Sequence, residues 1–295
     1  MAPSIIREEY LISGLQVWTF SHPAATNSTK PVQIDFVLHP RLQSQASYEE
    51  RVRRILELIY ETQDLQFDVV LVTFDLRNHG ERLVDVRANQ DWKKGNTTHA
   101  IDMYSIMEGS AQDVSLLIDY LPSYLYPTGD RHIAEWGVTG ISLGGHIVWL
   151  LLAYEPRLTL GVTIIGCPSF KSLMTSRAHQ SNISISPPYF PVSFLQHLDK
   201  TSAEAVPYAR KDAQNPFWKD KLLVIAGGKD TLVPWAKCED YMHNLQVGPE
   251  GAKVVSVYAD AGHVFTTEML EETAQFIGSS AAGTLSGRTV QRTIA

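Results

Sequence analysis

The amino-acid sequence predicts an α/β fold, in which a mostly parallel sheet of about eight strands is covered by helices on both faces. Short apolar runs, typical of buried strands, alternate along the chain with segments of helical periodicity, and this alternation is characteristic of parallel sheets. The chain has 295 residues, of which 44% are hydrophobic, so it can bury the sizeable core that such a sheet needs.

The expected elements follow one another in a regular order. Two short strands around a Ser13-Gly14 turn are expected within residues 10–21, and a loop rich in Pro, Ser, Thr and Asn follows them. A helix expected at 102–120 should stop at Leu121-Pro122. Further strands are expected at 32–38, 67–74, 133–139, 160–165, 221–226 and 253–258, and further helices at 48–62, 146–154, 234–245 and 266–277.

Two regions depart from this order. Residues 167–215 are rich in proline and lack a strong strand pattern. Because structureless connections of this length are uncommon in compact domains, a small helical cap is favoured there over a plain long loop. Residues 278–295 are rich in Gly, Ser, Thr and Ala and are expected to form a frayed, flexible tail. One domain is therefore expected over residues 1–277, with the cap inserted at about 167–215.

The most informative stretch is Gly140-Ile141-Ser142-Leu143-Gly144, which fits the pattern G-x-S-x-G. An expected strand precedes it and an expected helix follows it, so Ser142 lies on a strand-to-helix turn, the setting that this motif requires. Such a turn holds the serine in a strained conformation with its hydroxyl exposed. Side chains at Gly140 and Gly144 would collide as strand and helix approach. The alternative is a chance match, which this setting disfavours.

A serine hydroxyl becomes a strong nucleophile when a base takes its proton, and the base is usually a histidine oriented by a carboxylate. Asp230 follows the expected strand at 221–226, and His263 follows the one at 253–258. Both side chains should therefore reach the carboxyl edge of the sheet beside Ser142, in the chain order serine, acid, histidine. The alternative for Asp230 is a surface residue that caps the next helix.

An oxyanion hole needs two N–H donors. One is expected from the backbone of Leu143, directly after the nucleophile. The other is expected from the loop after the strand at 32–38, where Pro40 has no N–H to donate. Arg41 is therefore the candidate for the second backbone donor, with Leu42 next.

The loop from Asp75 to Arg82 follows the expected strand at 67–74 and is dense in polar groups. Because it lies at the same edge of the sheet, Arg77 or His79 could contact a substrate. The favoured interpretation is a hydrogen-bonded loop that braces the site.

Composition and charge exclude several classes of function. The net charge of −7 argues against nucleic acid or an anionic membrane as a partner. Cys167 and Cys238 form no C-x-x-C pair, and no cluster of metal ligands stands out, so neither a metal nor a cofactor is expected. The first residues do not look like a signal peptide and no stretch is long enough to span a membrane, so a cytoplasmic location is expected.

Together these residues resemble the α/β-hydrolase superfamily over roughly residues 5–277. The strand-to-helix turn around Ser142, called the elbow from here on, and the segments ending in Asp230 and His263 match the pattern of this superfamily. The loop beginning at Asp75 resembles that of small esterases and of dienelactone-hydrolase-like or prolyl-oligopeptidase-like relatives. The resemblance implies an eight-stranded, mostly parallel sheet and a cofactor-free Ser–His–Asp site. The chain departs from the superfamily pattern at two places. Dienelactone hydrolases have a cysteine nucleophile where this chain has Ser142, and His39-Pro40 stands where the superfamily usually has His-Gly after the third strand.

The function expected from these observations is that of a serine hydrolase acting on a small-molecule carboxylic ester or thioester. The same three residues could instead support acyl transfer or carbon–carbon bond hydrolysis in a biosynthetic pathway, because the pocket sets the substrate. A third alternative is a ligand-binding protein that keeps the fold without catalysis. Acyl and leaving-group specificity and the oligomeric state are left open by the sequence.

Overall fold

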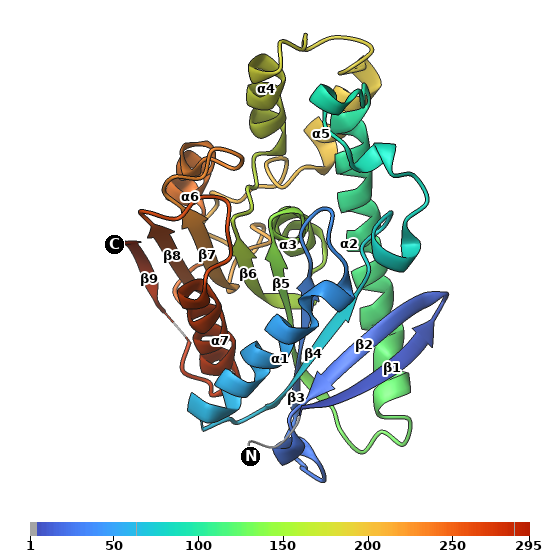
Figure 1. Ribbon diagram of the computed structural model, residues 1–295. Coiled ribbons are helices and arrows are strands. Elements are labelled where there is room, and N and C mark those ends of the chain that lie inside the picture. Colours follow the sequence, from blue (N-terminus) through green and yellow to red (C-terminus); the bar gives the residue numbers. More distant parts are fainter. Residues whose placement is uncertain (1–4, 63, 286) are drawn as a thin grey trace.

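The computed structural model describes residues 5–62, 64–285 and 287–295. One open sheet lies at the centre of the fold (Figure 1). Within these residues nine strands follow the order β1-β2-β4-β3-β5-β6-β7-β8-β9. β2 pairs antiparallel with β1 and β4, and all other neighbours are parallel. The predicted mostly parallel α/β sheet is confirmed, with one strand more than the eight implied. The strands are β1 (Ile6–Ile12), β2 (Leu15–Ser21), β3 (Val32–Leu38), β4 (Asp68–Phe74), β5 (Ile133–Ile141), β6 (Leu158–Ile164), β7 (Lys221–Gly227), β8 (Ala252–Tyr258) and β9 (Thr289–Ile294).

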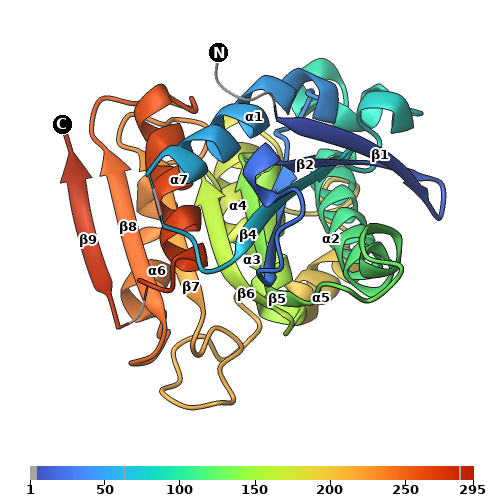
Figure 2. The ribbon, with the colours of Figure 1, turned by 90° about the horizontal axis from the view of Figure 1, so that it is seen from below.

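Helices cover both faces of this sheet, as Figures 1 and 2 show. On one face α1 (Gln45–Thr62) lies beside α7 (Thr267–Ala281), and on the other α2 (His99–Leu125) lies beside α3 (Leu143–Tyr154). The sheet therefore separates two large apolar clusters, one around Trp149 of α3 and the other around Ile277 of α7. Burial on both faces explains why β3 and β4 are buried at every position.

The region expected as a cap contains two helices, α4 (Phe170–Gln180) and α5 (Val192–Thr201). Figure 1 places them beyond the carboxyl ends of β5 and β6, near the upper end of α2. Hydrogen bonds fasten α5 to α2, because the Tyr104 hydroxyl lies 3.0 Å from Thr201 Oγ1 and the His197 ring lies 2.7 Å from a Glu108 oxygen. The inserted segment thus covers the edge of the sheet where the candidate residues lie.

The helix α2 runs past Leu121-Pro122, so the expected stop at this proline is wrong. Pro122 lies in the last turn of the helix, and its carbonyl still accepts a hydrogen bond from the Tyr126 N–H at 2.9 Å. Proline removes one N–H from the helix, but Leu117 and Leu121 are fully buried on the face that packs toward the sheet. That packing holds the turn in helical form.

The expectation of a frayed tail over residues 278–295 also needs a correction for the described residues, because they continue a helix and form a strand. α7 continues to Ala281, and β9 pairs parallel with β8 from Thr289 opposite Lys253 to Ile294 opposite Tyr258. Arg292 ties the strand down by donating to Ser256 Oγ at 3.0 Å and to Glu272 Oε1 at 2.5 Å. An edge strand pairs on one side only and can be polar, which is why composition alone missed it.

Candidate active site

Ser142 lies between the end of β5 and the start of α3, on the turn that the motif predicts. Its backbone has a φ of 54°, a conformation that side-chain-bearing residues rarely adopt. The Ser142 N–H donates to the Ile164 carbonyl at 2.9 Å and so fixes the turn against β6. The flanking glycines allow a close approach, since a Cβ on Gly140 or Gly144 would lie 2.2 Å from a backbone oxygen.

The structure brings Ser142, His263 and Asp230 together in one chain of hydrogen bonds. Ser142 Oγ lies 2.8 Å from His263 Nε2, and His263 Nδ1 lies 2.7 Å from Asp230 Oδ2. The three residues come from the loops after β5, β8 and β7, which are far apart in sequence and meet at the carboxyl edge of the sheet. This is the arrangement in which a histidine takes a proton from a serine while a carboxylate orients it.

Asp230 is held as a fixed acceptor. Its side chain is buried, and its Oδ1 accepts hydrogen bonds from the Leu232 and Val233 N–H groups, each at 2.8 Å. The other oxygen, Oδ2, is left for His263. His263 keeps 24% of its side chain exposed, so the acid is shielded from water while the imidazole stays open to a substrate.

The two predicted oxyanion donors come from different segments, the start of α3 and the loop after β3. Leu143 is the first residue of α3, and N–H groups in the first turn of a helix have no acceptor within the helix. Arg41 lies in the loop after β3, where Pro40 O accepts from the Gln43 N–H at 3.3 Å and Leu42 has a φ of 66°. The roles of both N–H groups stay predictions.

His39 joins this loop to the next one. Its Nε2 accepts a hydrogen bond from the Leu76 N–H at 3.0 Å, so its Nδ1 carries the proton and donates to the Pro40 carbonyl at 2.8 Å. Burial lowers the pKa of His39 to about 4, which keeps the ring neutral near pH 7. His39 therefore acts as a brace within the site.

The loop from Asp75 to Arg82 is held by hydrogen bonds within itself and to α1 and α2, as the favoured interpretation predicts. The Asp75 carboxylate accepts the Gln45 and Glu81 N–H groups, each at 2.8 Å. Arg77 and Arg82 both pair with Asp113 of α2, at 2.9 and 2.8 Å. Because Arg77 donates two hydrogen bonds to Asp113, this guanidinium supports the scaffold.

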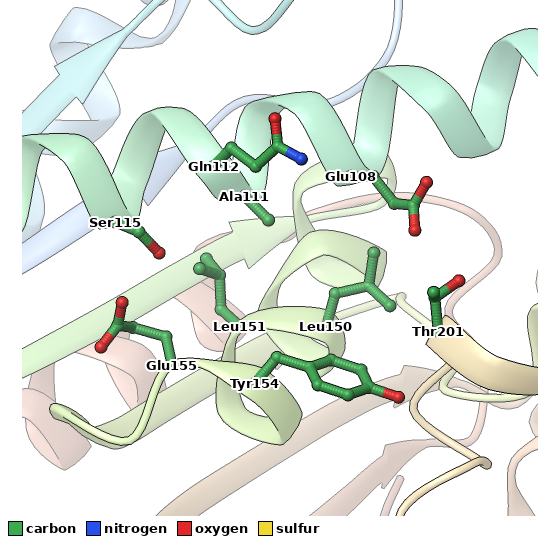
Figure 3. A pocket seen from close by; sticks show the side chains of 9 residues that line it. All are labelled: Glu108, Ala111, Gln112, Ser115, Leu150, Leu151, Tyr154, Glu155 and Thr201. Atoms are coloured by element: carbon green, nitrogen blue, oxygen red, sulfur yellow. The ribbon is translucent and has the colours of Figure 1, made fainter.

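A cavity of about 420 Å³ lies between α2, α3 and α5, away from Ser142 (Figure 3). Leu150, Leu151 and Ala111 form its apolar floor. The two carboxylates at its ends are paired, Glu108 with His197 and Glu155 with Arg157. None of its lining residues belongs to the Ser142–His263–Asp230 chain. The lining residues are Glu108, Ala111, Gln112, Ser115, Leu150, Leu151, Tyr154, Glu155 and Thr201.

Two further properties concern the described part of the chain. No group of three or more His, Cys, Asp or Glu side chains in it could hold a metal ion. None of its helices combines the length and apolar character needed to cross a membrane.

Comparisons with known proteins bear on the fold. No protein-family model matches the chain. A Yersinia pestis protein provisionally named a carboxymethylenebutenolidase is 24% identical over 221 residues, which cover 68% of this chain and 70% of that protein. The crystal structure of TT1662 from Thermus thermophilus superposes with a TM-score of 0.65 at 19% identity and covers 94% of this chain and 98% of its own.

An esterase from Pyrococcus furiosus, Pf2001, superposes with a TM-score of 0.52 at 16% identity and covers 92% of this chain and 91% of its own. At identities this low, the superposed structures show that the fold is shared and nothing more specific. The order of the strands, the elbow at Ser142 and these likenesses agree with one another. The chain therefore has the α/β-hydrolase fold, and its relatives are esterases and dienelactone-hydrolase-like proteins.

Proposed function

We propose that the protein is a serine hydrolase that cleaves small-molecule carboxylic esters or thioesters. The observation that carries the proposal is the unbroken hydrogen-bond chain from Ser142 Oγ through His263 to Asp230, at 2.8 and 2.7 Å. The esterase and carboxymethylenebutenolidase names among the relatives support it. No cofactor or metal is part of this proposal, and neither nucleic acid nor a membrane is proposed as a partner.

The first half of the reaction makes an acyl-enzyme. His263 Nε2 takes the proton from Ser142 Oγ as this oxygen attacks the carbonyl carbon. Asp230 accepts the Nδ1–H of the resulting imidazolium and stabilises its positive charge. The negative charge on the former carbonyl oxygen is stabilised by the N–H of Leu143 and, we propose, the N–H of Arg41. The C–O or C–S bond then breaks, and His263 gives its proton to the leaving alcohol or thiol.

The second half returns the free enzyme. A water molecule loses a proton to His263 Nε2 and attacks the acyl carbon. The bond to Ser142 Oγ breaks, His263 returns the proton to this oxygen, and a carboxylic acid leaves. Acyl transfer would differ only in the acceptor, because an alcohol or thiol would take the place of water.

A fluorophosphonate probe tests the nucleophile directly. We expect one stoichiometric adduct on the intact protein and none on Ser142→Ala. A panel of esters and thioesters of increasing chain length then identifies the substrate class, and added alcohols reveal transfer if ester replaces acid among the products. A folded wild-type protein that takes no adduct would favour the alternative of a ligand-binding protein. The cytoplasmic location stays a prediction, which imaging of a fluorescent fusion checks.

A further inference from the structure

The cavity between α2, α3 and α5 has no part in the proposed reaction, because none of its lining residues belongs to the candidate triad (Figure 3). Its volume of about 420 Å³ lies in the range of small-molecule sites. Leu150 and Leu151 of α3, together with Ala111 of α2, make its floor apolar. Tyr154 also lines it and is 49% exposed, so the cavity is open to solvent and a ligand can enter.

Hydrogen bonds hold the walls of this cavity in place. The Tyr154 hydroxyl donates to the Ser202 carbonyl at 3.0 Å and lies 3.2 Å from the Lys200 carbonyl, which joins the end of α3 to the end of α5. Thr201, between these two residues, bonds with Tyr104 of α2 at 3.0 Å. The three helices are therefore joined around the cavity, and a ligand binds there without the cost of ordering its walls.

One end of the cavity presents a carboxylate with free acceptor positions. Glu108 of α2 pairs with the His197 ring, whose Nε2 lies 2.9 and 2.7 Å from its two oxygens. One ring nitrogen supplies one donor at most, whereas a carboxylate has about four acceptor positions. The Glu108 side chain is 26% exposed, and Figure 3 shows it extending from α2 into the space between the helices. Glu108 can therefore accept further hydrogen bonds from a ligand.

The other end carries a carboxylate that already has its partners. Arg157 donates to both oxygens of Glu155, each at 2.7 Å, and these hydrogen bonds lower the pKa of Glu155. Arg157 also pairs with Asp119, so two carboxylates share one guanidinium and a negative charge is left over. The described residues that line the cavity include Glu108 and Glu155 but no Lys, Arg or His. The cavity therefore attracts a cation and repels an anion.

We propose that this cavity binds a primary amine that carries an apolar chain, taken up as the ammonium ion. The ammonium group donates to Glu108 in a charge-assisted hydrogen bond. The chain lies against Leu150, Leu151 and Ala111, so that its own apolar surface leaves water. The site is separate from the candidate triad, and the proposal does not rest on the hydrolase function.

Calorimetry with three six-carbon probes tests the charge preference. Hexylamine, hexan-1-ol and hexanoate share the same apolar chain and differ in the charge of the head group. We expect hexylamine to bind roughly tenfold or more tightly than hexan-1-ol, as for a hydrogen bond between charged groups, and hexanoate not to bind. From propylamine to hexylamine, each added methylene should tighten binding roughly fourfold, because it buries more apolar surface.

Three variants locate the binding. Glu108→Gln removes the charge with little change in shape, so the affinity for hexylamine should fall roughly tenfold or more while that for hexan-1-ol persists. His197→Ala is the matched control, because it breaks the same ion pair but keeps the carboxylate; hexylamine should bind it at least as tightly as the wild type. Ala111→Leu fills part of the cavity and should weaken the binding of both probes. It keeps the test open if Glu108→Gln does not fold.

Three results would overturn the proposal. The first is equal affinity for hexylamine and hexan-1-ol, and the second is hexylamine binding that neither Glu108→Gln nor Ala111→Leu weakens. The third is a loss in His197→Ala as large as in Glu108→Gln, because the pairing of α5 with α2, and not the charge, would then be what matters. Ester cleavage is measured on the same samples. Amine binding without ester cleavage would leave this site standing and remove the proposed function, and the reverse result would remove this site alone.

Discussion

Replacing Asp230 by Asn changes the chemistry of the candidate site with little change in its shape. In the wild type, Oδ1 accepts two backbone N–H groups and Oδ2 accepts from His263 Nδ1. The substituted side chain has one oxygen, and the two N–H groups of Leu232 and Val233 orient that oxygen toward themselves. Its NH₂ group then faces His263 Nδ1, which must accept, so the ring proton moves to Nε2. A protonated Nε2 cannot take the proton of Ser142.

The expected loss follows from this change of tautomer. In a serine protease triad the same substitution lowers kcat on the order of 10⁴-fold, which corresponds to about 5 kcal/mol in the activation barrier. We expect a similar loss of kcat for Asp230→Asn on any ester that the wild type cleaves, with a small change in unfolding temperature. Asp260→Asn is the control, since Asp260 is 77% exposed and pairs with Lys229 on the surface. A folded Asp230→Asn with kcat within about tenfold of the wild type would refute the assignment.

Three further substitutions test the scaffold. Burial raises the pKa of Asp35 to about 7 from an unfolded value near 4. Folding therefore takes up a proton between these pH values, and the free energy of unfolding falls as pH rises through this range. Asp35→Asn should flatten that dependence and stabilise the protein at pH 8, which urea unfolding at pH 5 and pH 8 will measure. Gly144→Ala would place a methyl group 2.2 Å from the Leu38 carbonyl oxygen, so we expect a loss of about 1–3 kcal/mol in unfolding free energy and of fluorophosphonate labelling. In the wild type, Arg131 Nη2 lies 2.5 Å from the buried Asp68 carboxylate. Arg131→Met removes this ion pair and should lower the free energy of unfolding by about 3–5 kcal/mol, which thermal unfolding will measure.

The central part of the fold and the three residues of the candidate triad could be predicted from the sequence because their signals are local. Strands such as β4 are nearly continuous apolar runs, since both faces of a parallel sheet are covered. The elbow around Ser142 has a fixed pattern of glycines, which the close approach of strand and helix requires. Asp230 and His263 follow strands that end at the same edge, so topology alone brings them together.

Other features depend on contacts between distant segments and leave no local pattern. β9 is stabilised by pairing with β8 and by the contact of Arg292 with Glu272 of α7, none of which the sequence around residue 290 reveals. Pro122 would end a helix judged by propensity alone, whereas packing of its neighbours against the sheet prolongs α2. The backbone of Arg41 could be proposed as an oxyanion donor from its position, but its side chain reaches Asn89 across 48 residues.

Arg177 illustrates how the cap and the candidate triad depend on each other. The sequence around it gives no sign of a role, because the partner of its guanidinium is the Leu232 carbonyl, 55 residues away. Through this contact α4 holds the loop whose N–H groups fix Asp230, so the cap supports the acid. A substitution at Arg177 should therefore lower kcat for any ester that the wild type cleaves. Lysine keeps the charge but loses the paired donors to Leu232. Arg177→Lys should therefore lower kcat, whereas Arg210→Gln, which removes an exposed arginine paired with Asp212, should leave kcat unchanged. A folded Arg177→Lys with the kcat of the wild type would contradict this support of the acid by the cap.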